Sequence, residues 1–171
     1  GLYNMNGGDS RLDKKHNSYA FLYPLSILRG KHRQIYSSFP NENVYTNLWE
    51  GPFHGFEKIV ESFQNTESPL RIKPINIYYH FYSGEHMGAL LALKKAYDYS
   101  VNENVFPIFS ADFVRIVDDF FSIEIVNIPG GHRILNKGYL RTIRYDDESR
   151  FVDMSRSKGV IGFQHFQDNL Y

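Results

Sequence analysis

The hydrophobic and polar positions in the middle of the chain follow helical and strand-like patterns in turn. Between residues 53 and 64 the apolar side chains recur at steps of three and one, as on one face of an amphipathic helix. Residues 75–84 (INIYYHFYSG) are rich in β-forming types and read as a strand that ends near His80, followed by a Ser-Gly turn. Residues 85–101 return to helical spacing. The large apolar residues at this spacing form a stripe of Met87, Leu90, Leu91, Tyr97 and Val101, and Lys94 and Lys95 lie outside it.

A second strand is predicted at residues 105–109 (VFPIF), after the second helix. Strand, helix and strand in this order predict a βαβ unit with parallel strands and a right-handed crossover. Ser110 is a favourable N-cap for a further helix. Because parallel sheets build their sites at the C-terminal ends of strands, His80 becomes a candidate functional residue. The alternative is a core strand in which His80 only finds a hydrogen-bond partner.

The two ends of the chain differ from its middle. Residues 1–50 read as irregular, with a turn cluster at residues 4–10 and room for one strand within residues 19–28. After residue 120, short apolar runs separated by Gly-rich or polar breaks predict an antiparallel β unit. These runs are residues 121–126, 132–135, 139–145, 151–154 and 160–163. We therefore predict two domains, residues 1–120 and 121–171.

Composition excludes several classes of protein. The 19 basic and 19 acidic side chains give a formal net charge of +0, without the basic stripe of a nucleic-acid binder. There is no run of 18 apolar residues that could span a membrane, and the absence of cysteine excludes disulfides and cysteine zinc sites. Aromatic residues make up 16% of the chain. They serve either to fill the core or to line a groove for a flat apolar ligand such as a sugar ring.

Local motifs offer little chemistry by themselves. His80 and His86 are close enough in sequence to share a metal ion, but spacing fixes no third ligand beside them. The pairs Gly7-Gly8 and Gly130-Gly131 lack the spacing of phosphate-binding loops. No serine or cysteine nucleophile motif is present.

Several longer stretches resemble a known family. NMNGGDSRL (4–12), NENVYTNLWEGPFHGF (41–56) and RIKPINIYYHFYSGEH (71–86) are similar to the later part of polysaccharide deacetylases. The similarity is greatest to those of the Pel biofilm exopolysaccharide system of Gram-negative bacteria. LRTIR (140–144) and KGVIGF (158–163) resemble the β-rich tail of the same proteins. The resemblance implies an α/β fold, the C-terminal part of a (β/α) barrel-like deacetylase domain with parallel strands, followed by a small antiparallel β unit.

The resemblance also implies a function and a set of site residues. It implies a periplasmic or secreted hydrolase that removes N-acetyl groups from a hexosamine exopolysaccharide. In this family a late strand carries a general-acid histidine after apolar residues, and the run from Ile77 to His80 matches that motif. His80 would then protonate the leaving amine. The residues that the resemblance places at the substrate are Asn6, Gly7 and Gly8 on the rim of the groove, and Trp49 and Tyr82 as its walls.

The metal site of the family is missing from this sequence. Such enzymes hold a divalent metal, zinc or cobalt, through an aspartate-rich motif and an H-x-x-x-H pair, and neither occurs here. We therefore expect the metal ligands to precede Gly1, which is not a methionine, and we expect this chain alone to be inactive.

Two other functions stay open. One is a non-enzymatic carbohydrate-binding or assembly module, in which aromatic residues bind and His80 is structural. The other is a degenerate domain kept for contacts with proteins, for which an exposed aromatic patch would be the sign. For the deacetylase, the resemblance implies as partners the polysaccharide substrate and proteins of an exopolysaccharide secretion system.

Overall fold

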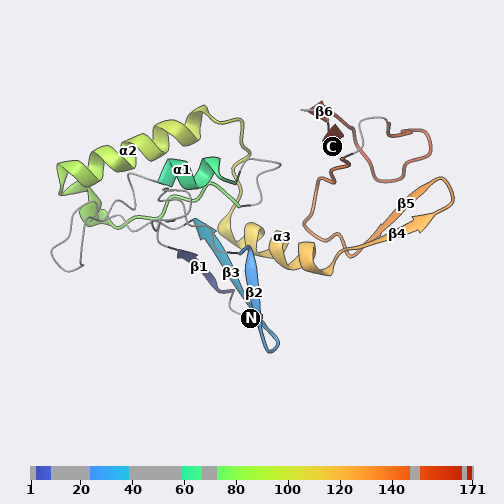
Figure 1. Cartoon of the computed structure of the whole chain (residues 1–171), viewed down its shortest axis with the longest axis horizontal. Helices are drawn as coiled ribbons and strands as arrows, with labels where there is room; N and C mark the ends of the chain where they lie inside the picture. Colours follow the sequence, from blue (N-terminus) through green and yellow to red (C-terminus); the bar gives the residue numbers. More distant parts are fainter. Residues whose placement is uncertain are drawn as a thin grey trace, which may run out of the picture. The chain divides into compact units, whose positions relative to one another are not determined.

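The computed structural model describes residues 3–8, 24–38, 59–66, 73–146, 151–166 and 169–170. In these residues the chain is a mixed α/β protein with three α-helices and small sheets (Figure 1). It divides into two compact units, residues 1–121 and 122–171.

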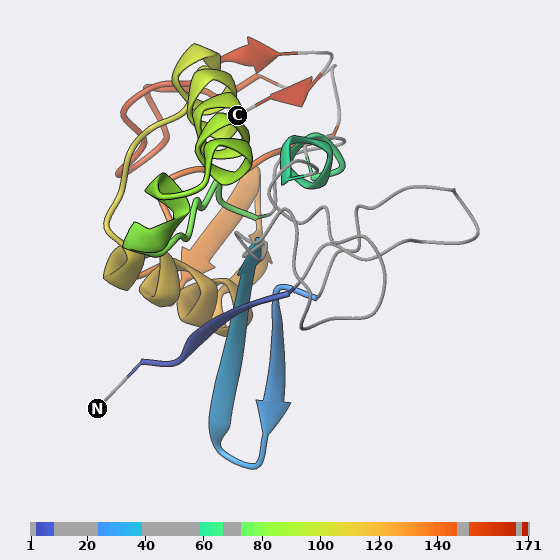
Figure 2. The ribbon, with the colours of Figure 1, turned by 90° about the vertical axis from the view of Figure 1, so that its left-hand side faces the viewer.

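The first unit contains a three-stranded sheet. Its strands are β1 (Met5–Gly8), β2 (Ser26–Arg29) and β3 (His32–Ser38), in the order β1-β3-β2. β2 and β3 form an antiparallel hairpin (Figure 2), and β1 runs parallel to β3 along its other edge. Gly30 opens the two-residue hairpin loop with φ 61°, the positive value that the first position of a type II′ turn requires.

Helix α3 (Ser110–Ser122) packs on this sheet and confirms the helix predicted from Ser110. Its residues Phe113, Val114 and Val117 are buried with Ile35 of β3. Because the Phe109 carbonyl accepts the N–H of Phe113 at 3.1 Å, Phe109 takes the N-cap position that the sequence assigned to Ser110. The large apolar contact, more than any cap, holds the helix on the sheet.

Arg33 of β3 also links the sheet to α3. The Nε atom of Arg33 lies 3.3 Å from an Asp118 carboxylate oxygen on α3. Its guanidinium carbon lies 4.1 Å from the centre of the Phe121 ring. The side chain therefore combines an ion pair with a cation–π contact, both of modest strength at a partly exposed site.

A second core lies between α1 (Ile59–Gln64) and α2 (Met87–Asn102). Ile59 and Phe63 of α1 are fully buried against Leu93 and a seam of alanines on α2. The Phe63 ring also stacks on Tyr99, with 6.0 Å between ring centres. Small side chains along the seam let the two helices approach closely, so the contact depends on the absence of bulk at these positions.

The position of α2 is confirmed to within two residues, but its buried face is not the apolar stripe that the sequence shows. Met87, Leu91 and Val101 are 68%, 57% and 75% exposed. The buried positions are instead Ala89, Ala92, Leu93 and Ala96. The periodicity of the sequence marks the face of α2 that carries its large apolar side chains. The face that is buried is the one that packs on α1, and most of its side chains are small.

The predicted βαβ unit is not formed in the described residues. Residues 74–80 and 104–109 have no regular secondary structure, and residues 81–84 are the short 3₁₀ helix η1 (Phe81–Gly84). An apolar run becomes a strand only where a neighbouring strand completes its ladder, and Pro107 lacks the N–H that a ladder needs. The parallel pairing in the described residues is between β1 and β3, so the turn cluster predicted at residues 4–10 is wrong for residues 5–8. The described residues close no barrel, and the barrel-like domain stays a prediction.

The second unit is built from short antiparallel pairs. β4 (Glu124–Ile128) and β5 (Gly131–Leu135) form the hairpin that the break at residues 129–131 predicted. Its loop is Pro129-Gly130, and Gly130 has φ 79°, as the third position of a type II turn requires. β6 (His165–Phe166) pairs with β7 (Asn169–Leu170). The other predicted runs, residues 139–145, 151–154 and 160–163, form no strands.

Candidate functional site

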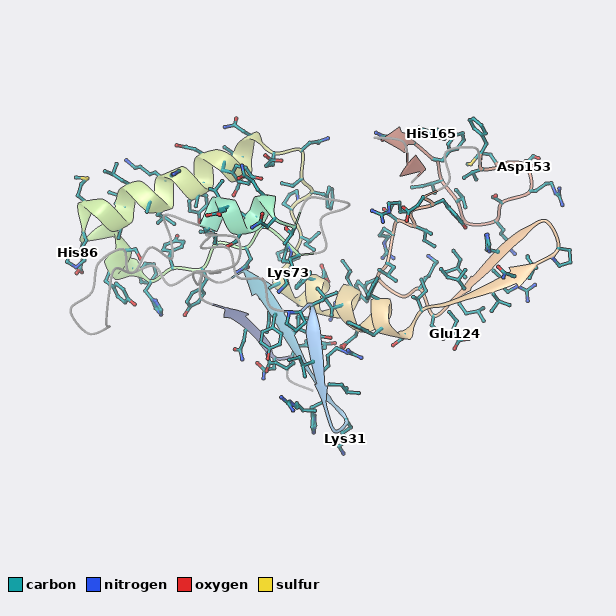
Figure 3. The ribbon with its side chains drawn as sticks, viewed as in Figure 1. Lys31, Lys73, His86, Glu124, Asp153 and His165 are labelled. Carbon is teal, nitrogen blue, oxygen red and sulfur yellow. The ribbon has the colours of Figure 1, made fainter. Side chains whose placement is uncertain are left out.

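The candidate site is the aromatic segment of residues 78–82, immediately before η1 and α2. His80 has an extended backbone, with φ −105° and ψ 160°, and the 3₁₀ turn begins at the next residue. The Ser83 N–H donates to the His80 carbonyl at 3.0 Å, which fixes the backbone where the chain changes direction. His86 then stands at the start of α2 (Figure 3).

Two tyrosines hold the His80 ring. The Tyr78 hydroxyl lies 3.0 Å from Nε2, and the Tyr82 hydroxyl lies 3.1 Å from Nδ1. The Tyr82 ring stacks on the imidazole, with 5.0 Å between centres and 10° between planes. The Tyr78 ring meets it edge-on, at 5.1 Å and 82°. Both nitrogens and one face of the imidazole thus have aromatic partners.

These contacts suit both protonation states of the imidazole. A tyrosine hydroxyl is a donor and an acceptor, whereas a neutral histidine has one donor and one acceptor nitrogen. When His80 is neutral, one hydroxyl donates to its free nitrogen and the other accepts from its N–H. When His80 is protonated, both hydroxyl oxygens accept. The arrangement is therefore compatible with a group that gives up and regains a proton.

His80 lies at an open depression of about 470 Å³, lined by Tyr79, His80, Phe81 and Tyr82. The Phe81 side chain is 97% exposed. Tyr79 is held against α2 through Tyr97, with ring centres 6.3 Å apart and planes at 80°. Burial raises the pKa of Tyr97, and its hydrogen bond with Tyr79 raises that pKa further. Exposed aromatic faces around a polar group offer a surface for a sugar ring.

The structure brings some of the predicted site residues together and not others. His80 and Tyr82 contact each other and line the depression. Residues 6–8 lie in β1 opposite residues 36–38 of β3, and the described lining of the depression does not include them. Trp49 falls outside the described residues.

Tyr78 is the contact residue that the sequence analysis missed. In an extended chain, alternate side chains point to the same side, so a side chain two residues before a histidine is expected beside it. The pattern Tyr-x-His at residues 78–80 carries that signal and could have found Tyr78. Tyr82, singled out as a sugar-contacting wall, reaches the ring from the turn η1 instead.

The described residues do not fit the divalent metal that the resemblance implies. No three histidine, aspartate or glutamate side chains gather within them. Both nitrogens of His80 lie within hydrogen-bond distance of tyrosine hydroxyls. In this arrangement neither nitrogen is open to coordinate a metal ion. Zinc or cobalt would have to take its ligands from other residues.

Among the helices that the structure describes, none has both the length and the apolar character that crossing a bilayer requires. Comparison of the chain with protein-family models, with curated proteins and with solved structures gives no match.

Proposed function

We propose that the chain is the C-terminal portion of a metal-dependent polysaccharide N-deacetylase that acts on a hexosamine exopolysaccharide. The observation that carries the proposal is the position of His80, exposed at an open depression with aromatic walls. The resemblance of residues 71–86 to the late part of such enzymes supports the same residue. By the same resemblance, we place the protein in the periplasm or outside the cell, with an exopolysaccharide secretion system as its partner.

His80 is the general acid in this proposal. When the tetrahedral intermediate of amide hydrolysis collapses, the bond between the acetyl carbon and the sugar nitrogen breaks. The imidazolium N–H gives its proton to that nitrogen, which leaves as a neutral amine. The neutral imidazole that remains accepts a hydrogen bond from a tyrosine hydroxyl, so the product state is not left with an unpaired nitrogen.

The test is replacement of His80 in the enzyme that contains this chain. His80→Ala should lower acetate release from a hexosamine polymer by about 10²- to 10⁴-fold, the usual contribution of a general acid. Circular dichroism should be unchanged, because the side chain is exposed. His86→Ala is the matched control, because His86 is also exposed but makes no side-chain cap hydrogen bond and lies outside the lining. Wild-type acetate release by His80→Ala would refute the proposal.

A second function is favoured by one observation, the nearly complete exposure of Phe81 beside the depression. In a non-enzymatic carbohydrate-binding or assembly module, this ring and its aromatic neighbours would bind the polymer, and His80 would be structural. Phe81→Ala would then abolish binding of hexosamine oligomers without changing thermal stability. Lost binding by Phe81→Ala together with full acetate release by His80→Ala would favour the module over the enzyme.

A further inference from the structure

We propose that Tyr78 is a positioning residue for His80, and that Tyr78 and Tyr82 together set which ring nitrogen faces the substrate. The inference rests on the proposed function, in which His80 donates a proton. It goes beyond that function because it assigns a role to Tyr78 and distinguishes the two nitrogens. Neither assignment is available from the family motif, which ends at the histidine.

The two tyrosines restrain the imidazole in different ways. Tyr82 lies parallel to the ring, which limits rotation out of the plane, and Tyr78 meets it edge-on. Their hydroxyls lie at different ring nitrogens, so a flip of the ring would place carbon atoms opposite both hydroxyls and break both hydrogen bonds. An exposed histidine without such contacts would sample several rotamers, and misplacing a proton donor by about 1 Å is enough to slow a reaction strongly.

The two nitrogens differ in their surroundings. Tyr82, the partner of Nδ1, lines the depression together with His80, whereas Tyr78, the partner of Nε2, is not part of its described lining. Nδ1 is therefore the nitrogen beside the space that a substrate would fill. Nε2 keeps its proton and its bond to the Tyr78 oxygen throughout, while Nδ1 exchanges the contact with Tyr82 for the leaving amine.

The experiment follows the ring nitrogens directly. The chain labelled with ¹⁵N-histidine is compared by long-range ¹H–¹⁵N NMR with the variants Tyr78→Phe, Tyr82→Phe and Tyr79→Phe. We expect Tyr78→Phe to shift the Nε2 resonance of His80 and Tyr82→Phe to shift Nδ1. Tyr79→Phe is the matched control, because Tyr79 lines the same depression but contacts Tyr97. Each variant removes only a hydroxyl from an exposed side chain, so folding should be retained.

Activity gives an independent readout. In the enzyme that contains the chain, Tyr78→Phe should lower kcat about 2- to 10-fold with little change in KM, as expected for one lost hydrogen bond. The inference is overturned if the Nδ1 and Nε2 resonances of His80 in Tyr78→Phe are the same as those in Tyr79→Phe. A different outcome would separate the two proposals. If His80→Ala is fully active but Tyr78→Phe still shifts the His80 resonances, the proposed function is refuted and the contact between Tyr78 and His80 is supported.

Discussion

Lys73 carries a positive charge into the interior of the first unit. Lys73 is only 5% exposed, and its Nζ donates to the Pro24 carbonyl at 3.3 Å. The described residues place no carboxylate within ion-pair distance of it. Burial therefore lowers the pKa of Lys73 from 10.5 to about 8, because the charged form loses its hydration.

The pKa shift sets the sign and size of a stability effect. Between about pH 8 and pH 10.5 the unfolded chain binds a proton at Lys73 and the folded chain does not, so stability rises with pH in this window. Below pH 8 both states are protonated, and the folded state bears the full cost of the buried charge. At 1.36 kcal/mol per pKa unit, the lowering of the Lys73 pKa from 10.5 to about 8 corresponds to about 3 kcal/mol of destabilisation of the folded state at pH 7. We take about 1–3 kcal/mol as the cost of the buried charge.

Replacing Lys73 by methionine tests this reasoning. Lys73→Met keeps the length of the side chain and removes its charge, so it should raise the free energy of unfolding at pH 7 by about 1–3 kcal/mol. Urea unfolding of wild type and variant from pH 7 to above pH 10.5 gives the difference between them. The difference in free energy of unfolding should shrink as the pH rises from about 8 to 10.5. Above this window Lys73 is neutral in both the folded and the unfolded wild type, so no charge is buried on folding.

Two results would refute the reasoning on Lys73. One is that the free energies of unfolding of wild type and Lys73→Met differ by the same amount at every pH. The other is that Lys73→Met is less stable than wild type at pH 7. Lys94→Met is the control, because Lys94 lies on the exposed side of α2 and its removal should shift the unfolding free energy little at any pH.

Two further predictions concern packing and backbone. Phe63→Ala should lower the free energy of unfolding of the first unit by about 3–5 kcal/mol, because the ring is fully buried between α1 and α2, and urea unfolding measures this loss. Gly130→Ala should destabilise the β4–β5 hairpin by about 1–2 kcal/mol, because φ is 79° there and an added Cβ would meet the Arg156 guanidinium at 3.3 Å. Amide exchange in β4 and β5 reports that loss, with Gly131→Ala as the unstrained control.

Local signals predicted the elements whose causes are local. The helices at 85–101 and from Ser110 are present because helical periodicity acts within a few residues. The β4–β5 hairpin is present because Pro-Gly chemistry fixes its turn. The hairpin of β2 and β3 was missed although Gly30 stands at its loop, since the charged residues around that glycine obscure the alternation.

Long-range contacts decided the rest. Residues 75–80 and 105–109 are as apolar as buried strands, yet in the described residues no strand pairs with them. Whether a pairing partner is present depends on distant parts of the chain, which a local pattern does not show. The buried face of α2 was chosen by α1, which no periodicity within α2 can reveal. At the candidate site, the sequence resemblance singled out His80, but it gave no information about Tyr78, because the partners of a side chain depend on the conformation around it.

The second unit has a consequence for how the chain holds together. None of its described side chains is buried. Ordering a residue costs about 1–2 kcal/mol of backbone entropy, and a two-stranded ribbon recovers little of that cost in water. A peptide of residues 122–171 should therefore give the circular dichroism of a random coil. Proteases added to the intact chain should cut within residues 122–171 before they cut within α1, α2 or the described strands of the first unit.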